Sequence, residues 1–564
     1  MEVNFVFYNK NGKKLSGYLD ESIKVIKDPA EAKSINIIIS NTDLVKPVIW
    51  AKEIDFYLNN SEDDVKTKAE NVLKLFKIQY IRYLFATDII KTKDISNTLL
   101  VIGTDDELTQ IESIEDKDLF NIKFAHPDEI EAITGVIGEF IVVFNNKTTA
   151  KFDQILWFSA EEDAIKAGVI DPYREGVAYA WAKVHNNLMN GYEYKKILAY
   201  DTDICLYHEK KSDVCGICAD ICPEEAITKD KENKHLIIND IKCSGCGGCV
   251  SICPAGALDF TETGRGAFYK MSKLFMDHIA LIIPEPVGLD ELRDVTLKKG
   301  VLPFIIGGRK FLDEAHFITL IQESSHQVIL YNNELSKGTE DAINIINQIF
   351  RSKYKKDGVL VATDKDELKE AISAAEKIDG SFFDIPNELF MTKREIFTKR
   401  LKFIVGEEDL GTIKTGKYVK YAEVKVDQTK CTLCLSCAGG CSVNALYPNK
   451  SDNSLRFKPY LCADCGYCKE VCPEDCITII EGEIQLNPSF FEEKILAKDE
   501  LFRCIECGKP FAPSKSIKKV AELFISIFGE DDPRVKTLYC CPDCKPKVML
   551  KMQIEERKKY ELKH

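Results

Sequence analysis

The stretch CSGCGGCVSICP, residues 243–254, decides the fold of the region around it. Its cysteines, Cys243, Cys246, Cys249 and Cys253, follow the spacing C-x2-C-x2-C-x3-C. Three closely spaced thiolates can hold one iron–sulfur cube, whereas the displaced fourth cysteine, followed by proline, ligates a second cube. The stretch therefore predicts one half of a domain that holds two clusters.

The same spacing recurs elsewhere in the chain. CTLCLSCAGGC (431–441) and CADCGYCKEVCP (462–473) are further copies, and 31 positions separate Cys222 from Cys253 and Cys441 from Cys472 alike. Structural zinc sites use two pairs of ligands rather than a triplet with a displaced fourth. Each of the two cysteine-rich regions, one containing Cys222 and Cys253 and the other Cys441 and Cys472, is therefore an internal duplication. The sequence predicts two dicluster domains whose halves exchange ligands.

This exchange predicts four [4Fe-4S] clusters, at sites that we name A to D. Site A comprises Cys222, Cys243, Cys246 and Cys249, and site B comprises Cys215, Cys218, Cys253 and one further ligand. Site C comprises Cys441, Cys462, Cys465 and Cys468, and site D comprises Cys431, Cys434, Cys437 and Cys472.

The first copy, CLYHEKKSDVCGICADICP (205–223), lacks one cysteine. Ser212 stands at the expected position, and Cys205 lies seven residues further upstream. Because clusters prefer thiolate ligands, we predict that Cys205 completes site B through a longer loop. His208, Ser212 and a cluster with an open iron are the alternatives.

One cysteine near site D has no place in the repeat. Cys476 comes four residues after Cys472, where the other copies have Ala226, Ala257 and Ala445. The position favours a small residue packed near the cube. We therefore expect a buried structural thiol rather than a ligand or a redox switch.

Two C-x2-C pairs near the C-terminus predict a separate metal site. Cys504, Cys507, Cys541 and Cys544 suit tetrahedral zinc, although rubredoxin holds iron with a similar set. The segment between the pairs, residues 516–529, has helical periodicity, and we expect this helix to pack on the metal site. Cys540 is expected to be a bystander.

Two long segments contain no cysteine. Residues 263–395 alternate strand-like pieces with amphipathic pieces at 289–300, 312–325 and 339–354, which predicts a parallel α/β layer. Residues 1–195 also have α/β character. No glycine-rich nucleotide fingerprint follows any strand. The charged residues around His316 and His326 are expected to form a solvated face.

The composition narrows the class of protein. A net charge of −14 and a pI of about 5.3 argue against nucleic-acid binding and suit docking to positively charged surfaces. We see neither a secretory signal nor an apolar run long enough to span a membrane, and so expect a cytoplasmic protein. In that reducing setting the 22 cysteines are expected to bind metals rather than form disulfides.

Together these features predict a multidomain α+β and α/β chain. It would comprise an N-terminal α/β domain (1–195), a dicluster domain (196–262), an α/β domain (263–395), a second dicluster domain (396–490) and a C-terminal four-cysteine zinc-type domain with a basic tail (491–564).

The motifs CSGCGGCVSICP and CADCGYCKEVCP resemble those of bacterial dicluster ferredoxins. The wider arrangement, with LFRCIECGKPF (501–511), resembles large 4Fe-4S proteins often encoded beside formate dehydrogenases. This resemblance implies an electron-transfer protein or redox subunit whose partner is a dehydrogenase, and no catalytic residue of its own. A maturation or redox-regulatory factor, and an oxidoreductase with an organic cofactor in an α/β domain, are the alternatives.

Overall fold

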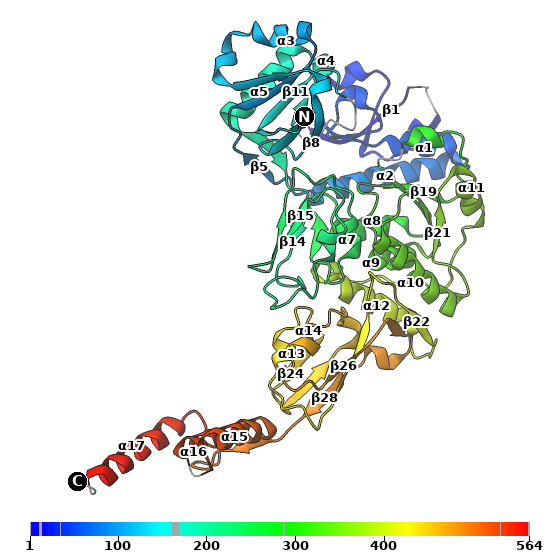
Figure 1. Ribbon diagram of the computed structural model, residues 1–564. Coiled ribbons are helices and arrows are strands. Elements are labelled where there is room, and N and C mark those ends of the chain that lie inside the picture. The colour runs from blue at the N-terminus through cyan, green and yellow to red at the C-terminus, as the bar shows by residue number, and fades with distance from the viewer. Residues whose placement is uncertain are drawn as a thin grey trace.

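The computed structural model describes residues 2–10, 14–33, 35–160, 168–285, 288–530 and 532–561. The chain forms an elongated body (Figure 1). The N-terminal sheets lie at one end, the central α/β layer and the first dicluster domain lie in the middle, and the second dicluster domain follows. Helices α15 to α17 extend from the far end.

The first 85 residues form a small parallel sheet and two helices that join the central core. The sheet has the order β2-β1-β3-β4, with strands β1 (Glu2–Tyr8), β2 (Ile23–Ile26), β3 (Asn36–Ser40) and β4 (Ile49–Trp50). Helices α1 (Lys52–Asn60) and α2 (Val65–Phe85) follow. Phe5, Phe76 and Phe268 belong to one continuous hydrophobic core, so this part of the chain packs on the middle of the molecule.

Residues 90–195 form a second unit with cores of their own. Its parallel sheet has the order β12-β11-β6-β7, with β6 (Thr98–Ile102), β7 (Asn121–Ala125), β11 (Gln154–Trp157) and β12 (Val169–Ile170). An antiparallel sheet is formed by β8 (Ile130–Thr134), β9 (Phe140–Phe144) and β10 (Thr149–Phe152). Helices α3 (Asp105–Glu112), α4 (Pro172–Glu175) and α5 (Val177–Asn190) accompany them, and β5 (Ile90–Lys93) pairs with β13 (Tyr192–Lys195).

The central layer is a parallel sheet, as its alternating pattern predicts. Its order is β19-β18-β20-β21, with β18 (Ile279–Pro284), β19 (Val301–Ile306), β20 (Val328–Tyr331) and β21 (Val359–Ala362). The helices that accompany it are α8 (Arg265–Ser272), α9 (Glu314–Ser324), α10 (Lys337–Tyr354), α11 (Lys365–Ala374) and α12 (Lys393–Val405).

Two expectations for this layer are wrong. Residues 289–300 form only a short 3-10 turn at Leu289–Leu292, because Leu297 then runs extended and donates its N–H to Asn60 at 2.9 Å. The expected solvated face on α9 is buried, since Glu314 and His316 are 0% exposed. The charges there are paired: Arg265 and Lys393 contact Asp313 at 2.9 and 3.4 Å.

Each dicluster domain consists of short strand pairs and one-turn helices. The first contains α6 (Ile217–Asp220), α7 (Gly248–Ile252), β14 (Leu198–Tyr200) paired with β17 (Leu258–Phe260), and β15 (Ile227–Asp230) paired with β16 (His235–Ile238). The second contains α13 (Ser436–Gly439), α14 (Tyr467–Glu470), β23 (Ala422–Val426) paired with β26 (Ile477–Glu481), and β24 (Leu446–Asn449) paired with β25 (Ser454–Phe457). It is flanked by β22 (Thr412–Lys414), β27 (Glu483–Gln485) and β28 (Lys494–Lys498).

The C-terminal part carries the last two cysteine pairs. It contains β29 (Leu501–Arg503), β30 (Pro510–Pro513), α15 (Ser514–Phe528), α16 (Pro533–Leu538) and α17 (Lys545–Glu561). The predicted helix is present as α15 and is followed by Gly529, whose φ of 88° suits glycine. No helix in the described part of the chain is both long and apolar enough to cross a bilayer.

Candidate functional site

A glycine or another left-handed residue starts the helix of each cysteine repeat. Gly216, Gly247 and Gly466 have φ values of 103°, 84° and 78° and directly precede α6, α7 and α14. Leu435 takes the same place before α13, with φ 61°. This conformation turns the chain sharply between two cysteines, so that both thiols can face one cube.

The cysteines of site A gather around one cavity of about 240 Å³. Cys222, Cys243, Cys246 and Cys249 all line it, together with apolar residues such as Ile221. Burial, followed by neighbouring thiolates, raises the pKa of Cys243 to about 11. Metal binding must therefore displace a proton from the Cys243 thiol, which ties the formation of a cluster to the release of acid.

The four thiols expected at site B also line one cavity. Cys205, Cys215, Cys218 and Cys253 lie around it, and Cys205 is 6% exposed. The backbone N–H of Tyr207 donates to the Sγ of Cys205 at 3.4 Å. The loop between residues 205 and 215 therefore brings the distant cysteine back to the other three.

The two other residues considered as ligands of site B are His208 and Ser212. Neither His208 nor Ser212 lines the site B cavity. The His208 ring contacts His235 at 3.1 Å between their Nδ1 atoms. The Ser212 hydroxyl is buried and has no hydrogen-bond partner in the described part of the chain.

Sites C and D lie side by side in the second dicluster domain. Cys441, Cys462, Cys465 and Cys468 of site C line one cavity, whose wall also includes Cys437 of site D. Burial, followed by the nearby thiolates of site D, raises the pKa of Cys437 to about 12. At site D, Cys431 is 9% exposed, whereas Cys434 is an exposed thiol.

Backbone amides reach the displaced fourth cysteines. Ala226 and Ala257 donate their N–H groups to the Sγ atoms of Cys222 and Cys253 at 3.3 and 3.2 Å. Such N–H···S bonds stabilise negative charge on the sulfur and so tune the potential of a bound cluster. At site D, Cys476 replaces the alanine, is 6% exposed, and places its Sγ 3.5 Å from that of Cys472.

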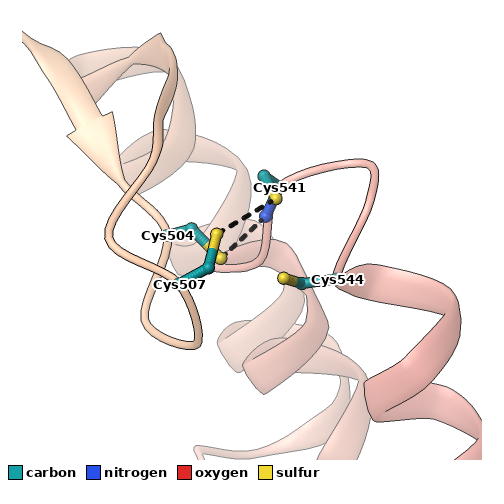
Figure 2. Close-up of side chains that lie close together, drawn as sticks. All are labelled: Cys504, Cys507, Cys541 and Cys544. Carbon is teal, nitrogen blue, oxygen red and sulfur yellow. Dashed lines mark hydrogen bonds between the residues drawn. The ribbon is translucent and has the colours of Figure 1, made fainter.

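The four C-terminal cysteines meet at one point (Figure 2). The Sγ atoms of Cys504, Cys507, Cys541 and Cys544 all lie within 4.8 Å of one another. The Sγ atoms of Cys507 and Cys541 are 3.7 Å apart, close to the edge of a tetrahedron with metal–sulfur bonds of about 2.3 Å. The donor set therefore fits one tetrahedral ion, either zinc or iron.

Backbone N–H groups and helix α17 surround these thiols. Burial opposes ionisation of Cys504, but backbone N–H groups, first that of Cys541, lower its pKa to about 6. The apolar residues packed around the site include Val548 and Met552 of α17 and none from α15. Leu523 and Ile527 of α15 are instead 56% and 68% exposed. Helix α15 itself packs on β29, β30 and α16, which flank the two cysteine pairs, while α17 supplies the apolar side chains next to the thiols.

Sequence reasoning missed the residues that join the two dicluster domains. Arg394 of α12 is 2% exposed, and its guanidinium donates to the carbonyls of Pro254, Cys462 and Lys420 at 2.7, 2.8 and 2.7 Å. Beside it, Lys393 donates to the carbonyl of Cys253 at 3.2 Å. Nothing in the basic, alternating pattern of α12 distinguishes these side chains from surface charges.

Comparison with known proteins agrees with this geometry. A family model described as a 4Fe-4S dicluster domain matches residues 213–262, and another with the same description matches residues 423–473. Proteins named archaeal-type glutamate synthase [NADPH], from Thermotoga maritima and Thermotoga sp. (strain RQ2), are each 29% identical over 65 residues. That similarity covers 12% of this chain and 13% of each relative. The chain thus contains two 4Fe-4S dicluster ferredoxin domains, as the cysteine spacing predicts.

Proposed function

We propose that this chain is an electron-transfer protein in which four [4Fe-4S] clusters, one at each of sites A to D, form a single path. The observation that carries the proposal is the packing of site B against site C. Clusters of this kind exchange one electron each, and their potentials depend on burial and on hydrogen bonds to sulfur. The chain's own residues bind the clusters, hold them near one another and exclude water from the path.

The contact between the two dicluster domains is apolar at its centre. Leu206, Ala255 and Ala463 form one small buried cluster, against which Cys215 of site B and Cys465 of site C both pack. The hydroxyl of Ser442 donates to the carbonyl of Cys205 at 3.3 Å. Ligand-bearing loops of the two domains are therefore in direct contact.

Polar contacts fix this interface from the side. Lys210 donates to the carbonyl of Gly440 at 2.8 Å, and the Tyr467 hydroxyl accepts the N–H of Lys211 at 3.4 Å. The buried guanidinium of Arg394 holds carbonyls from both domains. A relay built from independent domains would need none of these bonds, so they favour one continuous path.

The path would run in the order A, B, C, D. Sites A and B lie in the first dicluster domain, where burial first, and then thiolates of both sites, raise the pKa of Cys218. Sites C and D adjoin, because Cys437 of site D also lines the cavity of site C. Site D ends at the exposed thiol of Cys434. We propose that a dehydrogenase docks there, and a formate dehydrogenase is the partner that the sequence resemblance favours.

Chemical analysis tests the number of clusters. Anaerobically purified protein should contain about 16 iron and 16 sulfide per chain, in addition to one tetrahedral ion that we propose to be zinc. EPR-monitored reduction should resolve four one-electron steps. About 8 iron per chain would contradict the proposal.

A maturation factor is the second candidate, because site B has an unusual ligand loop. A maturation factor would lose a cluster, or transfer one, on incubation with an immature dehydrogenase. Stable iron content after incubation with apo-dehydrogenase, measured after separating the two proteins, would favour the electron-transfer function.

A further inference from the structure

A groove of about 580 Å³ lies beside site A, where three parts of the chain meet. Its walls come from β13, from the first dicluster domain and from the central sheet, and they include Tyr194, Lys196, Cys243, Phe260 and Gly307. The volume is within the range of roughly 300–1,000 Å³ that is usual for pockets that bind cofactors. Space for a small molecule is therefore present next to the first cluster.

The position of the groove relates it to site A. Cys243 lines both the groove and the cavity of site A. A molecule in the groove would thus be separated from a cluster at site A by a single cysteine residue. Glu285 and Gly307 directly follow β18 and β19, so the groove also borders the carboxyl edge of the parallel sheet, where ligands of α/β proteins bind.

The walls offer an aromatic surface. Tyr192 and Tyr194 have ring centroids 6.5 Å apart and ring planes inclined by 13°. Residues 192, 194 and 196 are half-buried, whereas Glu193 and Lys195 between them are exposed. Because side chains alternate along a strand, Tyr192 and Tyr194 share one side of β13, and half-buried Lys196 directly follows the strand. A planar ring system can stack against such tyrosines.

The groove is lined by three cations and by five carboxylates, of which those of Asp88, Asp240, Glu262 and Glu285 make ion pairs. Arg82 pairs with Glu262 and Glu285 at 3.2 and 3.3 Å. Lys195 pairs with Asp88 at 3.0 Å. Among the described residues, Lys196 makes no ion pair, so its ammonium can accept an anionic group of a ligand.

We propose that this groove binds a flavin mononucleotide, with its ring at Tyr194 and its phosphate at Lys196. The proposal rests on the proposed electron-transfer function. A nicotinamide releases two electrons together as a hydride, whereas a flavin can also release them singly, as a one-electron cluster requires. The reaction balances: a reduced flavin and two oxidised clusters give an oxidised flavin, two reduced clusters and two protons, which leave through the open groove.

Binding of FMN to anaerobically purified, cluster-loaded protein tests the assignment. Titration should quench FMN fluorescence with a stoichiometry of one per chain, and riboflavin, which lacks the phosphate, should bind about tenfold more weakly. Lys196→Gln should remove that difference between the two probes, whereas Lys24→Gln, on exposed Lys24 of β2, should keep it.

The ring contact has its own test. Tyr194→Ala should weaken binding of both probes about tenfold, Tyr194→Phe should retain it, and Tyr173→Ala, on a tyrosine that is 76% exposed, should leave it unchanged. No quenching, or quenching that Lys196→Gln and Tyr194→Ala leave intact, would overturn the flavin site. The iron content and the four EPR signals with dithionite, which reduces clusters without flavin, report separately on the electron path.

Discussion

At the scale of single residues, the least regular ligand is Cys205. If its thiol binds iron at site B, Cys205→Ser should remove or alter one EPR signal and cost up to about 4 iron per chain. Ser212→Ala should leave all four signals unchanged, because Ser212 does not line the cavity of site B. The reverse result would assign the ligand to serine.

Cys476 should tune site D without being required for its cluster. Its Sγ lies 3.5 Å from that of Cys472, so an S–H donor there would stabilise the more negative, reduced cluster. Removing one such bond, worth about 1 kcal/mol, should lower the potential of site D by on the order of 40 mV. Redox titration of Cys476→Ala checks this, and loss of the cluster in that variant would instead identify Cys476 as a ligand.

Glu53 should make stability depend on pH. Burial raises its pKa to about 7, against the hydrogen bond that Gln79 donates at 2.7 Å. A carboxyl whose pKa is raised in the folded state favours folding at low pH, and this contribution is lost as the pH rises from about 4.5 to about 7.

Replacement of this carboxyl gives a direct test. Glu53→Gln should stabilise the protein at pH 8, by on the order of 3 kcal/mol at most, and have little effect near pH 5. Anaerobic thermal unfolding at several pH values measures the difference, with Glu70→Gln, on exposed Glu70 of α2, as the control. Equal effects of Glu53→Gln at all pH values would contradict the assignment.

The candidate sites could be read from the sequence at this scale because metal ligands follow chemical rules of spacing. The grouping of Cys222 with Cys243, Cys246 and Cys249 follows from the displaced fourth position alone, and the four residues line one cavity. Arg394 could not be found this way. Its role depends on carbonyls contributed by Pro254, Lys420 and Cys462, which come together only in the folded chain.

At the scale of elements, local patterns predicted the strands of the central sheet better than its helices. Buried parallel strands such as β18 and β19 appear as short apolar runs. The amphipathic pattern of 289–300 misleads, because buried Leu297 lies in an extended segment whose N–H bonds to the carbonyl of Asn60 in α1, and not on a helical face. On α9, Glu314 and His316 resemble solvated residues, but Asp313, Lys393 and neighbouring helices bury them.

Removal of the C-terminal metal should affect only the elements that surround it. The core there contains four thiols, Phe511, Val548 and Met552 and is too small to fold without cross-links. Cys541→Ser should therefore lose one tetrahedral ion and expose residues 500–561 to proteolysis. The iron of sites A to D should stay at about 16 per chain, measured by metal analysis. Loss of that iron would show that the sites depend on one another.

At the scale of the whole molecule, the cysteine spacing alone leaves open whether the two dicluster domains touch. The structure packs them against each other through Leu206, Ala255 and Ala463, with α12 beside the contact (Figure 1). The decisive contacts join residues more than two hundred positions apart, such as Lys210 with Gly440, so no local pattern could indicate them. No local pattern could indicate the groove beside site A either, because its walls come from three parts of the chain.

The central claim is that the clusters of sites A to D form one electron path. EPR of the fully reduced, anaerobically purified protein tests it most directly, because neighbouring reduced clusters broaden and split one another's signals. We predict an intensity of about four spins per chain and a spectrum that is not the sum of isolated clusters, with interaction between sites B and C as well as within each domain. Fewer than four spins, or two pairs of signals with no interaction between the two domains, would contradict the account.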